Sequence, residues 1–189
     1  MRYSRSETAA KHEKILQAAA RMFREQGFGS VSVAQIMQSA GMTHGAFYAH
    51  FSSKDALAAE AVGHAMAQLD EQRQAPLDQS DPLAAFSESY LTAQHRDDPG
   101  NGCAIAALGP SIARNPKIAG PFTEQIQQSL ARLAPHIDGV TAEQGRRQAI
   151  HTLSTAVGAM IIARAVSDPA LSDEILASAR DSLSQAGSE

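Results

Sequence analysis

Apolar residues recur every three or four positions along most of this chain, and this spacing puts them on one face of successive helices. Each run ends at a glycine, a proline or a residue type that caps helices. Alanine supports the same interpretation, because it supplies 36 of the 189 residues and loses almost no side-chain freedom in a helix. No stretch has the alternating pattern of a half-buried strand. We therefore expect an all-α protein of about nine helices.

The helix boundaries follow from caps and breakers. Ser32 with Gln35, and Thr141 with Gln144, have the spacing of a capping box. Ser52 and Ser172 are further candidate caps, and Pro82 is expected in the first turn of its helix. The expected helices span residues 8–26, 32–40, 44–50, 52–75, 81–95, 103–113, 121–134, 141–166 and 172–186.

Composition narrows the class of protein. The longest apolar stretch, residues 156–162, is far shorter than the roughly 18 residues of a membrane span, and no apolar signal core follows Met1. A single cysteine, Cys103, excludes an intrachain disulfide framework. We therefore expect a soluble cytoplasmic protein that needs no membrane, with no metal and no cofactor.

The charge is divided unevenly along the chain. Residues 1–60 hold seven Lys or Arg and five Asp or Glu, a net charge of +2, whereas residues 61–189 have a net charge of −6. A basic head on an acidic body is typical of a small DNA-reading module joined to a part that does not touch DNA.

Residues 32–51 read as helix, glycine turn, helix, with Gly41 in the turn. A short turn of this kind joins the two helices of a DNA-binding helix-turn-helix, whose second helix places its N-terminal side chains in the major groove. We expect Phe47 to face inward and to fix this second helix on its scaffold. The predicted DNA-binding residues are Thr43, His44 and Gly45 at the helix start, and Tyr48, His50 and Lys54 beyond it.

Residues 33–57, which read VAQIMQSAGMTHGAFYAHFSSKDAL, resemble the DNA-binding signature of the TetR/AcrR family. The close match covers about residues 11–60. By position, Thr43, His44 and Gly45 lie where family members reach bases or nearby backbone, and Tyr48, His50 and Lys54 lie where they hold phosphates. The sequence departs from the pattern at Ala46 and Ala49, where longer or polar residues are common, so two contacts are missing.

The resemblance implies a helix-turn-helix DNA-binding domain over residues 1–52 and a helical ligand-binding and dimerisation domain over residues 53–189. It also implies a homodimeric transcriptional regulator, usually a repressor, that binds a palindromic operator in double-stranded DNA. A small-molecule inducer of unknown identity would release it from the operator.

The helical body offers candidates for the dimer interface and the ligand site. Apolar stripes on the last two expected helices could form a four-helix bundle with a second copy or pack in the chain's own core. The candidate interface residues are Leu153, Val157, Ile161, Leu176 and Leu183. Apolar side chains with a few polar groups suit a ligand chamber. The candidate ligand-binding residues are Met66, Phe86, Tyr90, His95, Phe122, Met160 and Arg164.

Cys103 suggests an alternative function. It is expected in the first turn of a helix, with Asn101 as a possible cap, and a helix N-terminus stabilises a thiolate. The protein could then be a repressor that senses electrophiles or oxidants through this thiol, although Asp97 and Asp98 oppose the thiolate. More distant alternatives are an enzyme that pairs Cys103 with His95 or His151, and a metal sensor built from His64, His95 and His151.

Overall fold

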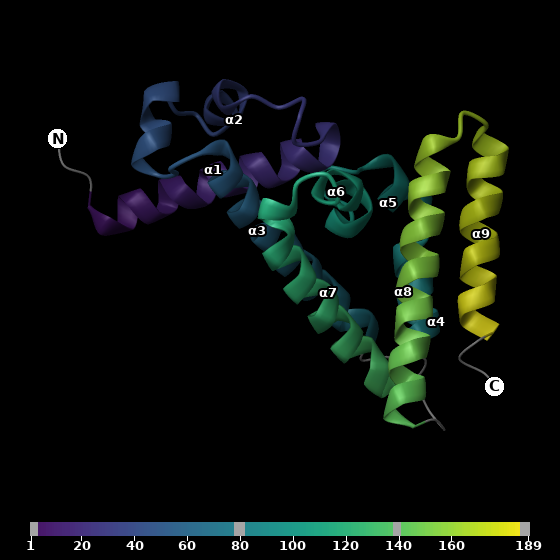
Figure 1. The fold of residues 1–189 in the computed structure, drawn as a ribbon. Coiled ribbons are helices and arrows are strands. Elements are labelled where there is room, and N and C mark those ends of the chain that lie inside the picture. Colours follow the sequence, from purple (N-terminus) through teal and green to yellow (C-terminus); the bar gives the residue numbers. More distant parts are fainter. Residues whose placement is uncertain (1–3, 78–81, 138–140, 186–189) are drawn as a thin grey trace.

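The computed structural model describes residues 4–77, 82–137 and 141–185, and every regular element in these ranges is a helix (Figure 1). The all-α expectation is confirmed. The elements are α1 (Arg5–Gln26), α2 (Val33–Ser39), η1 (His44–Ala49), α3 (Lys54–Leu77), α4 (Pro82–Tyr90), α5 (Ala93–Asp97), α6 (Ala104–Ile112), η2 (Pro116–Ile118), α7 (Ala119–Leu133), η3 (Ala134–His136), α8 (Ala142–Ala165) and α9 (Pro169–Gln185), where η marks a 3-10 helix.

The head of the molecule is built from α1, α2 and η1 around a small apolar core. Ile15, Phe23, Ile36 and Phe47 are fully buried there. Both capping boxes predicted from the sequence are present. The backbone amide of Gln35 donates to Ser32 Oγ at 3.2 Å, and Thr141 and Gln144 repeat the arrangement at the start of α8. Local capping therefore fixes where α2 and α8 begin.

The body is a layer of longer helices below the head. The helix α3 runs from the head into the body and packs against α1, α4, α6 and α7, while α8 and α9 lie side by side at one edge (Figure 1). Because α1 also packs on α6, the head rests on two helices of the body. Within the described residues, no helix is both long and apolar enough to cross a bilayer.

Several predicted boundaries were wrong, and tertiary contacts explain most of the differences. The expected helix over residues 81–95 is two helices, because Thr92 is extended and its side chain caps α5 by accepting from the His95 amide. Ser53 rather than Ser52 caps α3, through the Ala56 amide. The helix α9 begins at Pro169, and Ser172 instead donates its hydroxyl to the Ala163 carbonyl on α8 at 2.7 Å.

Two further differences concern candidate sites. The second helix of the helix-turn-helix is a 3-10 helix, and Thr43 precedes it without a side-chain capping bond. Cys103 is the residue that precedes α6 rather than a member of its first turn. Asn101 does not cap α6, because its side chain donates to the Asp98 carboxylate at 2.9 Å.

Candidate functional site

The outer face of η1 is open to solvent while its inner face is anchored in the head. Thr43, His44 and Gly45 are exposed, whereas Phe47 is buried, as predicted. Gly41 supplies the turn before η1 with a φ of 73°, a conformation that residues with a Cβ rarely adopt. The burial of Phe47 therefore fixes η1 with its N-terminal end pointing outward.

The far end of η1 presents aromatic and titratable side chains. Tyr48 is 71% exposed, and its ring meets His44 edge-on with centroids 6.4 Å apart. His50 is half-buried, and its ring centroid lies 5.9 Å from that of His12 on α1. The pKa of His50 is lowered, first by burial and then by repulsion from His12 and Lys11.

Lys54 makes a contact that the sequence did not reveal. Its Nζ donates to the backbone carbonyl of Phe28 at 2.6 Å, so it ties the start of α3 to the loop after α1. The side chain is half-buried. Lys54 therefore stabilises the head as well as carrying a positive charge near η1.

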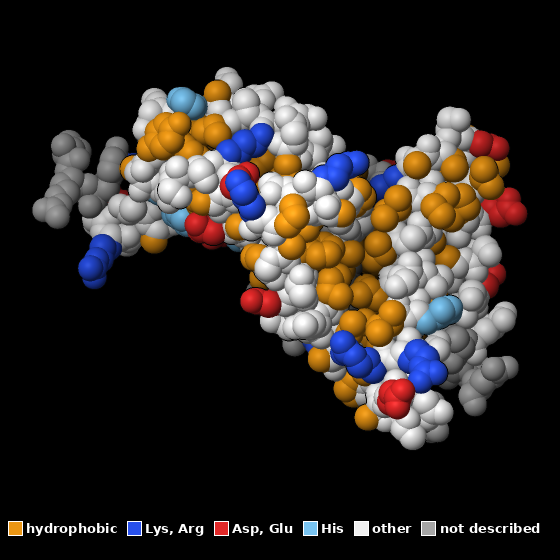
Figure 2. All heavy atoms as spheres, viewed as in Figure 1, with side chains coloured by type: hydrophobic (Ala, Val, Ile, Leu, Met, Phe, Trp, Pro, Cys, Tyr) orange, Lys and Arg blue, Asp and Glu red, His pale blue; other side chains and the backbone are white. Residues whose placement is uncertain are grey.

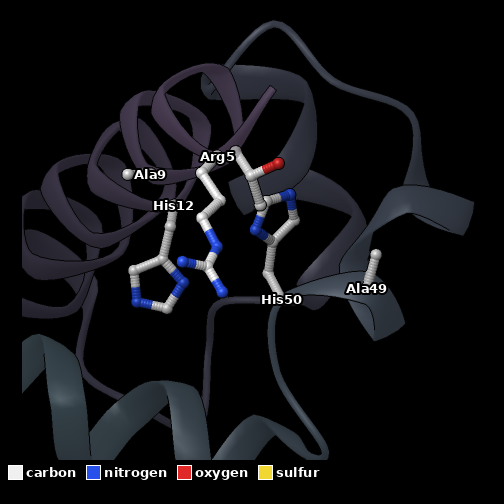
Figure 3. Close-up of a pocket in the computed structure, with 6 residues that line it drawn as sticks. Arg5, Ala9, His12, Ala49 and His50 are labelled. Carbon is white, nitrogen blue, oxygen red and sulfur yellow. The ribbon is translucent and has the colours of Figure 1, made fainter. Parts of the chain in front are cut away.

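Sequence reasoning also missed a hollow beside η1. It has a volume of about 500 Å³ and is lined by Arg5, Thr8, Ala9, His12, Ala49 and His50 (Figure 3). The basic start of the chain was the signal in the sequence that could have indicated this hollow. No sequence motif links residues 5–12 with residues 49–50, because α1 meets the end of η1 only in the folded head.

A family model described as bacterial regulatory proteins, tetR family, matches residues 15–61, the segment that forms this surface. Residues 15–61 of the chain therefore carry the DNA-binding segment of the TetR family. The uncharacterized HTH-type transcriptional regulator YvdT of Bacillus subtilis is 47% identical over 51 residues, which are 27% of this chain and 26% of YvdT. The HTH-type transcriptional repressor BepR of Brucella suis is 33% identical over 95 residues, which are 49% of this chain and 46% of BepR. The chain thus spans from about a quarter to about half the length of these relatives.

Solved structures extend the likeness to the whole fold. A transcriptional regulator of the TetR family from Cytophaga hutchinsonii superposes with a TM-score of 0.80 at 18% identity over 98% of both chains. The reduced form of E. coli NemR superposes with a TM-score of 0.77 at 17% identity, over 92% of this chain and 95% of NemR. TetR-family proteins are transcription regulators and not enzymes, so the match over residues 15–61 argues against the Cys/His enzyme.

Three of the seven candidate ligand residues meet in one polar cluster. His95 Nε2 accepts from the Cys103 amide at 2.7 Å, so the ring proton is on Nδ1, which donates to the Tyr90 carbonyl at 2.7 Å. The Arg164 guanidinium donates to the carbonyls of His95 and Arg96 at 2.6 and 3.0 Å. With both nitrogens of His95 engaged by the backbone, this ring has no free nitrogen to serve as a base for Cys103.

The other candidate ligand residues take different places. Met66, Phe86 and Met160 are buried in the core, and the Phe86 ring lies 5.4 Å from that of Tyr90, which is also buried. Phe122 is half-buried on α7 beside α6. In the described residues, no group of three His, Cys, Asp or Glu side chains could hold a metal ion, so the histidines of the metal-sensor alternative do not cluster.

Arg24 joins this cluster from the head and was not predicted. It lies near the end of α1 with 8% of its surface exposed, and its Nε has no hydrogen-bond partner among the described residues. Burial lowers its pKa, an effect opposed by nearby Cys103 and Asp98. The cluster thus reaches from α8 through α5 to α1.

The candidate dimer residues divide into two groups. Leu153, Leu176 and Leu183 are buried in the chain's own core, whereas Val157 is half-buried and Ile161 is 37% exposed. Between α8 and α9 lies an open groove of about 550 Å³. Its lining is formed by Ser154, Thr155, Gly158, Ala159, Ile162, Leu171, Glu174, Ile175, Ser178, Ala179 and Ser182.

Proposed function

We propose that this protein is a homodimeric TetR-family repressor that binds a palindromic DNA operator and releases it when a small molecule binds the helical body. The observation that carries the proposal is the exposed start of η1, held outward by buried Phe47 within the segment that matches the family. Because an operator lies on the bacterial chromosome, the proposal puts the protein in the cytoplasm.

DNA recognition is proposed to divide between bases and backbone. Thr43, His44 and Gly45 would meet base edges in the major groove, where small residues permit close approach. Tyr48, His50 and Lys54 would hold phosphates, which set the register without reading sequence. We assign the DNA-binding domain to residues 1–52 and the ligand-binding and dimerisation domain to residues 53–189.

Dimerisation is proposed through the outer faces of α8 and α9. Ile161, Ile162 and Leu171 are exposed apolar side chains on these helices, and most residues that line the groove between the helices are small and permit close approach. A second copy packed against this face would bury them in a four-helix bundle. The proposed interface keeps Val157 and Ile161 and takes in Ile162, while Leu153, Leu176 and Leu183 support the face from beneath.

Ligand binding is proposed in the body between α3, α7 and α8, where Figure 2 shows apolar side chains gathered along a hollow of the surface. The apolar candidates Met66, Phe86, Phe122 and Met160 would form walls. The polar end would be the cluster of Tyr90, His95 and Arg164, which lies beside the junction of body and head. A ligand that draws Arg164 from its carbonyl partners would disturb α5 and, through Arg24, the end of α1.

In vitro selection tests the function. The full chain would be incubated with a random pool of DNA duplexes at low salt, and retained duplexes would be sequenced over several rounds. A palindrome with half-sites about one or more helical turns apart is expected. A compound screen for release from the selected duplex would then identify an inducer. Recovery of no enriched sequence, together with no binding to any duplex at low salt, would contradict the proposal.

A thiol-sensing repressor is the second candidate, favoured by the charges around Cys103. Arg24 and Arg164 both lie within electrostatic range of this thiol, and cations favour the thiolate. Cys103 is fully buried, so an electrophile reaches it only when α6 opens. N-ethylmaleimide should add to Sγ across its double bond and release the selected duplex. A Cys103→Ser protein released equally by this reagent would exclude the candidate.

A further inference from the structure

The hollow beside η1 joins two parts of the head that are distant in sequence. Arg5, Thr8, Ala9 and His12 line it from the first two turns of α1, and Ala49 and His50 line it from the end of η1. In Figure 3 the side chains of Arg5, His12 and His50 converge on the hollow. Ala49 and His50 follow Tyr48 directly in the chain, so the hollow lies at the end of the element proposed to contact DNA.

Of the six residues that line the hollow, the formally charged one is the cation Arg5. Arg5 is exposed, and among the described residues no hydrogen bond or ion pair is found for its guanidinium. Lys11 acts on His50 as a further positive charge. Of the two nearby acids, Glu7 accepts from the Ser4 amide at 2.7 Å, and Glu60 is paired with the lining residue His12 through Nε2 at 2.9 Å. The hollow therefore offers a site for an anion.

The two imidazoles are held in place by different contacts. His12 stacks on buried Phe51 at 4.5 Å and is oriented by Glu60, so its ring is fixed before any ligand arrives. His50 lies next to it and is half-buried. Burial disfavours the protonated form of His50, as do its neighbours His12 and Lys11, and Arg5 also lines the hollow. An anion in the hollow would reverse this preference.

We propose that this hollow binds one phosphate of the DNA backbone, with Arg5 and His50 as direct donors and His12 as a positioning residue. The inference rests on the proposed DNA binding and adds the start of α1 to the contact surface. The DNA backbone is favoured over a free phosphate because Ala49 ends, and His50 directly follows, the element proposed to enter the major groove, and phosphates flank that groove.

The first test measures the salt dependence of binding to the duplex selected by the wild-type protein. Removal of one phosphate contact lowers the slope of log K against log salt by about 0.9 per protomer. In a dimer, Arg5→Ala should therefore lower the slope by about 1.8, and Arg5→Lys should restore most of it. Arg21→Ala is the matched control, since Arg21 is an exposed cation on the same helix, paired with Glu25 far from the hollow.

The second test measures the pH dependence of the same binding. Contact with phosphate favours charged His50, so its pKa is higher in the complex than in the free protein, where burial and its neighbours lower it. Binding is then tight at low pH and weakens as pH rises through the pKa of the complex, by up to about tenfold per pH unit for each protonated site. His50→Gln should flatten this dependence, whereas the same substitution at His151, an exposed residue of α8, should not.

The outcomes separate the two proposals. A wild-type protein that binds no duplex contradicts the proposed function itself. A wild-type protein that binds, with an unchanged slope in Arg5→Ala and an unchanged pH profile in His50→Gln, overturns the phosphate site alone. The hollow would instead be a site for free phosphate if inorganic phosphate shifts the NMR signals of His50 and Arg5→Ala keeps the wild-type salt slope. That result also overturns the inference. Because Arg5 is exposed, its variants test the site without loss of the fold.

Discussion

At the scale of single residues, burial within the helix-turn-helix followed from the sequence, whereas the partners of several polar side chains did not. Phe47 was expected to face inward because an aromatic residue at that spacing packs on α1 and α2, and it is buried. Lys54 was expected only as a phosphate contact. Its bond to the Phe28 carbonyl joins positions 26 residues apart, and no local pattern encodes such a pair.

His44 and Lys54 should therefore respond differently to substitution. His44→Ala removes an exposed side chain that we assign to bases, so it should change sequence preference at one or two base pairs and leave stability unchanged. Lys54→Ala should weaken binding to all sequences, flatten the salt slope and lower the free energy of unfolding by about 1 kcal/mol, since the Phe28 carbonyl loses its donor. Parallel selections and urea melts would measure these effects.

Lys117→Ala is the control for Lys54, because Lys117 is an exposed cation paired with Asp55 near the same end of α3. It should leave both DNA binding and stability within about 0.5 kcal/mol of wild type. Equal losses on selected and random duplexes for His44→Ala and Lys54→Ala would contradict the division between base and backbone contacts.

At the scale of helices, caps were predictable and interruptions were not. The capping boxes of α2 and α8 depend on residues three positions apart, so spacing alone reveals them. The break between α4 and α5 is different, because Leu91 is buried and His95 bonds to the Tyr90 carbonyl and, across the loop that follows α5, to the Cys103 amide. These contacts form only after folding, so the sequence pattern predicted one continuous helix over residues 81–95.

Ser32→Ala tests how far the cap of α2 controls the DNA-binding surface. The variant loses the acceptor for the Gln35 amide, and a lost N-cap lowers the free energy of unfolding by about 1 kcal/mol. Because α2 has only seven residues and carries η1 behind it, amide hydrogen exchange over residues 33–50 should accelerate and DNA affinity should fall. Ser32→Thr should restore both.

Ser30→Ala is the control for this experiment, since Ser30 is exposed just before the same helix and no side-chain hydrogen bond is found for it among the described residues. Uniform acceleration of exchange over the entire chain in Ser32→Ala would show that the cap supports global stability and not this element in particular.

At the scale of the molecule, the sequence predicted a helical head and body but not how they touch. Arg24 of α1 is buried beside the segment before α6, and Glu25 lies against Gly100. The two segments are more than 70 residues apart, so only the fold brings them together. Beside α3, this junction gives a second path by which a change in the body could move the head, because α1 carries the core on which η1 rests.

Dimerisation is also a property of the whole molecule. Ile162 is 52% exposed on the groove between α8 and α9, so Ile162→Glu should leave the fold of the single chain intact but bury a charge in the proposed interface. Wild type should sediment at about twice the chain mass of 20.0 kDa and Ile162→Glu at the chain mass itself. The control Ala131→Glu places the same charge on an exposed site of α7 and should stay dimeric.

Affinity for the selected palindrome should fall by about 10²-fold or more in Ile162→Glu, because two half-sites are no longer bound together, while affinity for a single half-site should be unchanged. A dimeric Ile162→Glu protein would move the proposed interface to another face.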